Sequence, residues 1–417
     1  MTNDPVGGSA RSKGAAVQGG ATSGGGPSGG GPSGGAGQDR SVHRGVRDRI
    51  VRSGSIPFSE FMDLALYAPG EGFFATGGGA GRGGADFVTS PEVGPLFGVV
   101  VGEYLDRRWE ALGCPDPFVV VESAAGRGAL AMSVLAASPR CRAALRYVLV
   151  ERSDDLRSRQ GTHLSIGHPF EVLGPSVDPE DPWAVGPGRG SGPLLCSLQD
   201  LPAEAVDGVV FANELLDNVP FQLVERTVGG WLEVRVTSLG DEFVELTVPL
   251  DAVSSRRADE LAPDAVPGAR IPLQFAAVDW LRRAVGMVRR GSVVAIDYTS
   301  STPELAGRPQ WDWLRTYRAH DRGAGPLVAP GSQDITVEVA VDQLAGAMVP
   351  TRRSTQADWL GRHGIDDLVE EGRRIWNASA SRPGIDAMRA RSRVSEAEAL
   401  VDAGGLGAFE VLEWDLP

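Results

Sequence analysis

A carboxylate and two glycines stand where an apolar run gives way to a helical pattern. Glu122 follows the apolar residues 118–121, and Gly126 and Gly128 precede ALAMSVLAA, so we predict a strand, a turn and a helix. At such a turn in an open α/β sheet, glycines let a ligand approach the backbone, and the helix N-terminus faces the ligand. We therefore expect a nucleotide-type cofactor at this turn.

The spacing of this turn favours S-adenosylmethionine over a dinucleotide. The series from Glu122 to Gly128 is E-x-A-x-G-x-G, whereas dinucleotide sites use G-x-G-x-x-G. An acidic residue at the strand end suits the ammonium and sulfonium of S-adenosylmethionine. Glu151, at the end of the next predicted strand, can accept hydrogen bonds from both ribose hydroxyls. Asp200 and Leu201, after the third strand, are placed to flank the adenine.

The segment FANELLDNVP supplies groups that could hold a methyl acceptor. Methyl transfer needs mainly alignment of the acceptor, and carboxylates bind a guanidinium bidentately. We predict that Glu214 and Asp217 orient the acceptor and that the amide of Asn213 lies near the transferring methyl. The alternative is that Asn213 and Asp217 cap the following turn.

Further candidates lie in and before a long polar stretch. His320 could act as a base beside a carboxylate, although a loop histidine is often only solvated. Asp297 ends the fifth predicted strand and either walls the acceptor side or holds a loop through backbone hydrogen bonds. For Trp311, Trp313 and Tyr317, anchoring in the core is favoured over stacking on a substrate.

Alternating strands and helices must position these groups. Apolar runs predict strands from residue 118 and at 145–151, 194–198, 207–217 and 291–298, with helical patterns between them. This alternation predicts an α/β fold with a doubly wound, mostly parallel, Rossmann-like sheet. Within residues 220–250, VGG and LGD separate three runs of period two, which predicts an inserted antiparallel meander. Two helices, at about 251–262 and 273–290, are expected to follow, and GAFEVLEWDL to form a closing strand.

Composition divides the rest of the chain. Residues 1–45 form a Gly/Ser-rich segment that we expect to be a disordered tail. Residues 46–117 are expected to form a helical region that contributes to the cofactor site, and residues 118–417 the main domain. The polar stretch 299–334 is too long for a plain connection, so we expect a lid or binding loop.

Charge and cysteine usage exclude several classes of function. The formal net charge of −14 over 417 residues argues against a nucleic-acid partner. No apolar run approaches the roughly 20 residues that span a bilayer, so we expect neither membrane insertion nor a secretory signal. The three cysteines lack metal-ligand spacing, which predicts reduced thiols, no metal site and a cytoplasmic protein.

Several longer motifs carry a family resemblance over about residues 55–415. The most specific are TSPE-x-x-x-LFG from Thr89 and NE-x-x-D-x-x-P from Asn213, accompanied by IPFSEFMDLALYAPGEGFF, VESAAGRGAL and VLVERSDDLRSRQ. The chain resembles the MidA family of S-adenosylmethionine-dependent methyltransferases, which contains the mitochondrial complex I assembly methyltransferase. The resemblance implies that mitochondrial members methylate an arginine of a complex I subunit. A respiratory dehydrogenase subunit is therefore the first protein substrate we expect.

The resemblance also implies which residues approach the cofactor. These are Thr89, Ser90, Pro91, Glu92, Glu122, Gly126, Gly128 and Glu151, with Ala124 in the turn. Ala124-Ala125 stands where the family has Gly-Pro, and the added methyl of Ala124 is expected to narrow the turn. Two alternatives follow: a methyltransferase-fold assembly protein that has lost turnover, and a methyltransferase that acts on a small molecule.

Overall fold

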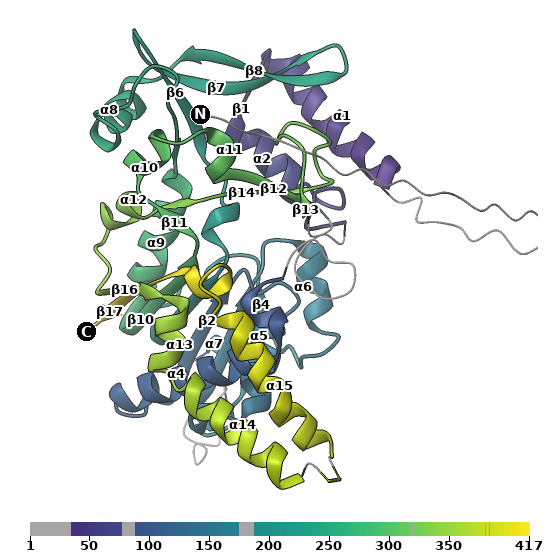
Figure 1. The fold of residues 1–417 in the computed structure, drawn as a ribbon, viewed down its shortest axis with the longest axis vertical. Coiled ribbons are helices and arrows are strands. Elements are labelled where there is room, and N and C mark those ends of the chain that lie inside the picture. Colours follow the sequence, from purple (N-terminus) through teal and green to yellow (C-terminus); the bar gives the residue numbers. More distant parts are fainter. Residues whose placement is uncertain (1–34, 77–87, 175–186, 319–320, 380, 383) are drawn as a thin grey trace, which may run out of the picture.

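The computed structural model describes residues 35–76, 88–174, 187–318, 321–379, 381–382 and 384–417. The described chain forms two stacked parts (Figure 1). The lower part is built on a mostly parallel sheet, and the upper part on an antiparallel sheet with helices beside it.

The lower part contains a seven-stranded sheet. Its spatial order is β16 (Arg352–Thr355), β17 (Glu410–Leu416), β10 (Val288–Asp297), β5 (Val206–Asn213), β2 (Phe118–Ser123), β3 (Leu145–Val150) and β4 (Leu194–Leu198). The five strands from β10 to β4 are parallel to one another, whereas β17 is antiparallel to both of its neighbours. The predicted α/β fold, its mostly parallel sheet and the closing strand are therefore confirmed.

Helices cover both faces of this sheet, because its strands are apolar on both sides. In β2 all six residues are buried, with Val120 in one core and Val119 and Val121 in the other. The first core is closed by α4 (Pro95–Ala111), α5 (Ala129–Ala137), α13 (Gln356–Arg362), α14 (Ile365–Ser379) and α15 (Ile385–Leu400). The second core is closed by α7 (Pro169–Leu173), α9 (Phe275–Met287) and α12 (Val341–Ala345), while α6 (Asp154–Gln160) lies beside β4.

The upper part is the inserted meander extended by two further strands. Strands β6 (Gln222–Thr227), β7 (Gly230–Leu239) and β8 (Glu242–Pro249) pair antiparallel in sequence order, as predicted. Strand β1 (Ile56–Pro57) adds to β7, and β9 (Arg270–Leu273) adds to β6. Helices α2 (Phe58–Tyr67) and α8 (Ala252–Leu261) pack on this sheet. By their positions in the chain, α8 and α9 are the two helices predicted at about 251–262 and 273–290.

The stretch 299–334, predicted to be a long lid or binding loop, instead contains several short helices and strands. It contains β11 (Thr299–Ser300), α10 (Thr302–Ala306), α11 (Gln310–Trp313), β12 (Leu314–Arg318) and β13 (Asp321–Arg322), and β14 (Asp334–Val337) and β15 (Val339–Ala340) follow. β12 pairs with β13 and β14, and β11 with β15. Trp313 and Leu314 are buried with Ile335 and Val337 in the core of the upper part. This burial of apolar side chains explains why the polar stretch is ordered.

The predicted tail boundary at residue 45 is also corrected. Helix α1 runs over Gly35–Ser53, so it includes the last eleven residues of the predicted tail. Val42, Val46 and Ile50 are four residues apart and are buried against the upper part. Residues 1–34 of the predicted tail lie outside the described residues.

Two searches of the described residues bear on function. None of the helices there is long and apolar enough to cross a bilayer. In the same part of the chain, no group of three or more His, Cys, Asp or Glu side chains could hold a metal ion.

Candidate active site

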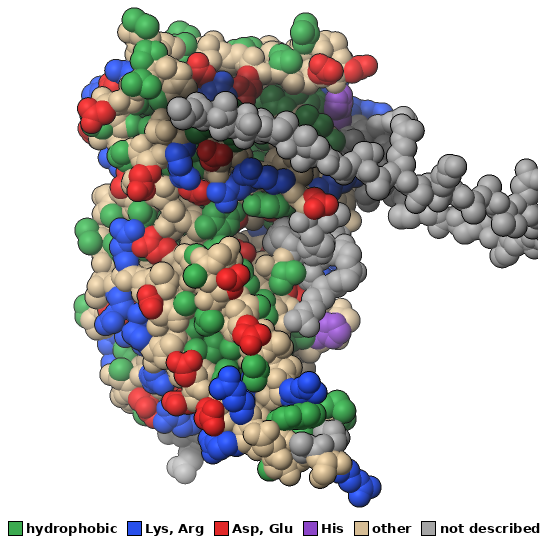
Figure 2. All heavy atoms as spheres, in the orientation of Figure 1, with side chains coloured by type: hydrophobic (Ala, Val, Ile, Leu, Met, Phe, Trp, Pro, Cys, Tyr) green, Lys and Arg blue, Asp and Glu red, His purple; other side chains and the backbone are tan. Residues whose placement is uncertain are grey.

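The parallel register brings the strand-end carboxylates to one edge of the sheet. Ser123 pairs with Val150 and with Ala212, and Ile296 pairs with Asn213, so β2, β3, β5 and β10 end side by side. A cavity of about 280 Å³ lies at this edge. Figure 2 shows a hollow between the two parts of the molecule on this face.

Both parts of the molecule line the cavity. The sheet contributes the turn after β2, Glu151 after β3, residues 213–215 and 217–218 after β5, and Tyr298 after β10. The upper part contributes Tyr67, Phe74, Tyr317, Asp334 and Thr336. The cavity thus has one end at the predicted cofactor turn and another at FANELLDNVP.

Glu122 lies in the wall at the cofactor end. The hydroxyl of Tyr147 donates a hydrogen bond of 2.7 Å to its Oε2. Burial raises the pKa of Glu122 to about 8, although the hydrogen bond from Tyr147 lowers it. A bound ammonium or sulfonium would favour the ionised carboxylate, so this residue suits the cationic end of S-adenosylmethionine.

Glu151 is held in place by the turn that it faces. Its Oε2 accepts a hydrogen bond of 2.8 Å from the amide of Gly126, and its Oε1 accepts one of 2.8 Å from the amide of Ser153. Burial raises the pKa of Glu151. Each carboxylate oxygen has two lone pairs, so both can still accept a ribose hydroxyl.

The turn after β2 uses left-handed backbone at three positions. Ala124, Gly126 and Gly128 have φ of 58°, 53° and 85°. Gly128 does not line the cavity; a Cβ there would lie 2.7 Å from Leu164 Cδ1, so this glycine permits close packing. Ala124 is strained, because a residue with a Cβ rarely adopts this conformation. The departure from the family pattern therefore falls at a position that requires glycine geometry.

The segment TSPE reaches the cavity from α3 (Ser90–Val93). Thr89, Pro91 and Glu92 line it, whereas Ser90 is buried behind them. The amide of Ser90 donates to Glu214 Oε1 at 3.3 Å, and its hydroxyl donates to Gln356 Oε1 at 2.9 Å.

Asn213 and Glu214, which were predicted to lie beside the methyl acceptor, meet where β5 ends. Asn213 Nδ2 donates to Glu214 Oε1 at 2.9 Å, and Asn213 Oδ1 is buried with no hydrogen-bond partner among the described residues. Burial, followed by the charge of Asp217, raises the pKa of Glu214 to about 8. The backbone of Glu214 is left-handed, with φ of 51°, which is strained for a side chain of this size.

Asp217 and Asp334 line the cavity together with Glu214. Asp217 Oδ2 accepts hydrogen bonds from the hydroxyls of Thr336, at 2.6 Å, and Tyr298. Its Oδ1 is buried and has no hydrogen-bond partner in the described part of the chain, and burial raises the pKa of this carboxyl. Asp334 Oδ1 accepts a hydrogen bond of 3.0 Å from Asn218 Nδ2. Three carboxylates, Glu214, Asp217 and Asp334, thus line one end of the cavity.

Asp297 holds the turn that carries these groups. The amides of Leu216 and Asp217 donate to its Oδ2 at 2.9 and 3.3 Å, and the amide of Tyr298 donates to its Oδ1 at 3.0 Å. This is the structural role that the sequence left open for Asp297.

The remaining predicted residues have different outcomes. Asp200 and Leu201 are not in the cavity wall, and Asp200 forms an ion pair of 2.6 Å with Arg283. His320 lies outside the described residues. Trp313 is buried as expected, but Trp311 is 69% exposed, so core anchoring was wrong for Trp311. Tyr317 is half-buried and lines the cavity.

Sequence reasoning missed Tyr67, Phe74 and Gln356. The first two lie in the segment IPFSEFMDLALYAPGEGFF, whose family match was the available signal. Gln356 carried no local signal, because its role depends on a contact with a residue 266 positions away.

Comparison with known proteins decides the family. The model of a family of S-adenosyl-L-methionine-dependent methyltransferases matches residues 100–357, more than half of the chain. The chain belongs to this family. A crystal structure of a methyltransferase-like protein from Burkholderia thailandensis, bound to S-adenosyl-homocysteine, is similar with a TM-score of 0.73 and 28% identity. The match covers 92% of this chain and 94% of that one.

Curated relatives of this methyltransferase carry more specific names. The protein arginine methyltransferase NDUFAF7 homolog of Drosophila melanogaster is 29% identical over 72% of this chain and 68% of its own length. Human NDUFAF7, also named a protein arginine methyltransferase, is 26% identical over 76% of this chain and 72% of its own. Both are named as mitochondrial, so they do not support the expected cytoplasmic location. S-adenosylmethionine is the cofactor of the family, and the strand-end carboxylates and turn amides of this cavity fit it.

Replacing Glu151 by alanine tests the cofactor end. Loss of a charged hydrogen-bond acceptor should weaken binding of S-adenosylmethionine by about 10- to 100-fold, measured by calorimetric titration. Asp200→Ala is the matched carboxylate outside the cavity and should leave the affinity unchanged. An equal loss in both variants would show that Asp200 reaches the adenine after all.

Replacing Ala124 by glycine should stabilise the protein. Glycine adopts the left-handed backbone without a Cβ penalty, so the free energy of unfolding should rise by about 1 kcal/mol in chemical denaturation. Ala125→Gly is the matched control, because Ala125 is buried and lacks a positive φ, and it should lower the stability. A lower stability of Ala124→Gly would contradict the strained conformation.

Proposed function

We propose that this methyltransferase transfers a methyl group to an arginine side chain of a protein. The observation that supports the proposal is the set of three carboxylates, Glu214, Asp217 and Asp334, that lines the acceptor end of the cofactor cavity. A guanidinium offers five N–H donors in a plane and keeps its charge, so it matches several carboxylate acceptors at once. The buried Oδ atoms of Asn213 and Asp217 add two acceptors without partners among the described residues.

The aromatic walls suit the same planar group. Tyr67, Tyr298 and Tyr317 line the cavity with the carboxylates. Guanidinium groups stack on aromatic faces, so these rings can restrict the plane in which an arginine enters.

The raised pKa of Glu214 supports a role in proton transfer. S-adenosylmethionine supplies a methyl group that is already activated on a positively charged sulfur. The arginine nitrogen that gains the methyl must lose one proton, and we assign Glu214 as the group that accepts it and releases it to solvent. A base whose pKa is near the working pH is suited to this task.

The names of the relatives support a protein substrate. Those compared above are named protein arginine methyltransferases, and the family resemblance makes a respiratory dehydrogenase subunit the first candidate. The direct test incubates the purified protein with methyl-labelled S-adenosylmethionine and that subunit, and locates the label by mass spectrometry. Label on arginine is expected. Label on another residue, or only on small molecules of an extract, would overturn the proposal.

Replacing Glu214 by glutamine should reduce kcat by about 10²- to 10⁴-fold, since the proton acceptor is lost. The ionised carboxylate that holds the cation becomes more populated as pH rises through about 8. In the native protein, kcat/KM should therefore increase with pH and level off above that value, and Glu214→Gln should lack this rise.

Glu398→Gln is the matched control for that substitution, because Glu398 is exposed on α15. It should keep the native rate and pH profile. Glu214→Gln removes a carboxylate whose ionisation is opposed by burial, so its unfolding free energy at alkaline pH should not fall. A pH profile that is unchanged by Glu214→Gln would exclude this residue as the proton acceptor.

A further inference from the structure

A second cavity of about 730 Å³ lies beside the first in the upper part of the molecule. Four arginines, Arg270, Arg308, Arg315 and Arg322, line it together with Trp311, and no acidic residue is in its described wall. We call it the arginine pocket. Blue side chains gather over α11 and β12 on the face drawn in Figure 2. This concentration of arginine stands out in a chain whose net charge is −14.

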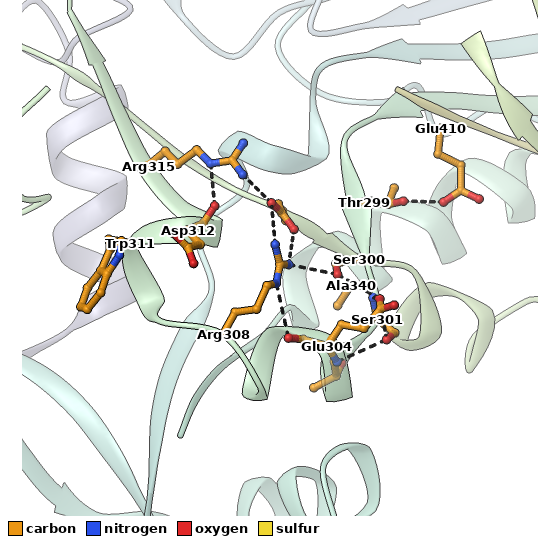
Figure 3. Close-up of polar contacts among 12 residues, drawn as sticks. Thr299, Ser300, Ser301, Glu304, Arg308, Trp311, Asp312, Arg315, Ala340 and Glu410 are labelled. Carbon is orange, nitrogen blue, oxygen red and sulfur yellow. Dashed lines mark hydrogen bonds and ion pairs between the residues drawn. The ribbon is translucent and has the colours of Figure 1, made fainter. Parts of the chain in front are cut away.

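Most of these guanidinium groups are fixed by neighbours. Arg308 and Arg315 share the carboxylate of the buried Glu338, with contacts of 2.5 and 2.6 Å. Arg308 also donates to Ser300 Oγ at 3.1 Å, and Arg315 donates to the carbonyl of Asp312 at 2.7 Å (Figure 3). These contacts hold the side chains before a ligand arrives, so little side-chain entropy is lost on binding.

The pocket keeps positive charge in excess. Arg308 and Arg315 have one carboxylate, Glu338, as their only ion-pair partner within 4.0 Å among the described residues, while Asp312 and Glu304 act on Arg308 from further away. Arg322 donates to the carbonyl of Trp311 at 2.9 Å, and no carboxylate of the described chain lies within 4.0 Å of its guanidinium. Arg270, by contrast, is compensated by Glu225 and Glu245. The excess charge therefore lies on the side of α11, β12 and β13.

Trp311 adds an apolar contact to this charge. It follows Gln310 at the start of α11, and 69% of it is exposed, although buried Trp313 lies two residues away in the same helix. Tryptophan and arginine are both enriched among the residues that contribute most binding energy at protein interfaces. In Figure 3, the ring of Trp311 points away from the cluster of Arg308 and Arg315. It is thus available to a partner that also contacts the arginines.

The arginine pocket and the methyl-transfer cavity have wall residues that lie close together. The guanidinium of Arg315 lies 6.0 Å from the centre of the Tyr298 ring, and Tyr298 lines the first cavity. Tyr317, two residues along β12 and on the same face of the strand as Arg315, lines that cavity too. We expect that one bound chain can reach both sites.

We infer that the arginine pocket binds an acidic segment of the protein substrate, with an aromatic or apolar side chain on Trp311, while the target arginine occupies the carboxylate cavity. The two sites then have opposite charge, so a substrate binds in one direction, with its cation at Glu214, Asp217 and Asp334 and its anions at the arginines. This inference rests on the proposed function, because it assumes a protein substrate.

Binding can be measured without catalysis. The probe is a fluorescent peptide that contains several glutamates and one phenylalanine, titrated by anisotropy into the full-length protein saturated with S-adenosyl-homocysteine. A second peptide carries glutamine in place of glutamate. We expect the acidic peptide to bind at least about tenfold more tightly, with an affinity that falls as salt is added. Equal binding of the two peptides would overturn the inference.

Two variants and one control locate the binding. Trp311→Ala and Arg322→Glu should each lower the affinity for the acidic peptide by about 5- to 10-fold. Arg374→Glu makes the same charge change on exposed α14 at the opposite end of the molecule and should have no effect. Unchanged binding in both pocket variants, or a single-stranded oligonucleotide that binds more tightly than the peptide, would contradict the inference. Thermal unfolding confirms that each variant is folded.

The outcome is separable from that of the proposed function. Once a protein that the enzyme methylates has been identified, Trp311→Ala and Arg322→Glu should raise the KM for that protein and leave kcat unchanged. Arginine methylation with an unchanged KM in both variants would refute substrate binding in the arginine pocket and leave the proposed function intact. Tight binding of acidic peptides that both variants weaken, without any label on arginine, would support the arginine pocket as a binding site and refute arginine methylation.

Discussion

The cost of burying carboxylates without cations is the constraint on which the site depends. Glu122, Glu151, Glu214 and Asp217 lie at one edge of the sheet, and none of them forms an ion pair within 4.0 Å in the described part of the chain, although the charge of Arg157 lowers the pKa of Glu151. Amides and hydroxyls partner them instead, and burial raises the pKa of each carboxyl. Such groups are costly to ionise until a positive charge arrives. The cavity therefore selects cationic ligands, and the family's cofactor is cationic.

The two parts of the molecule supply different ends of this site. The parallel sheet supplies the cofactor end, because strands in register present their carboxyl ends together. The upper part brings Tyr67, Tyr317 and Asp334 to the acceptor end from α2, β12 and the start of β14. The inserted meander is the support that carries these side chains over the sheet edge. Differences in the upper part would thus alter the acceptor while leaving the cofactor end unchanged.

The sequence predicted those features that depend on local periodicity. Period-two runs located the meander, and apolar runs ending in Glu122 and Glu151 located two residues that line the cavity. It failed where burial is decided by distant partners. The apolar residues of α1 are sparse within a Gly/Ser-rich segment, and the stretch 299–334 is polar apart from the side chains that enter the upper core. Asp200 also follows a strand, but its neighbour is Arg283 rather than the cavity.

The left-handed backbone of Glu214 places the fold and the chemistry in conflict at one residue. Glycine would relieve the strained φ of 51°, and losing the buried carboxylate would remove a second cost to the folded state. Both gains in stability require the loss of the Glu214 side chain, which is the proposed proton acceptor. Selection of random variants for heat resistance alone would therefore enrich glycine at this position and yield stable proteins with a much lower turnover. If glutamate were kept at position 214 in the selected variants, the activity itself must have been under selection.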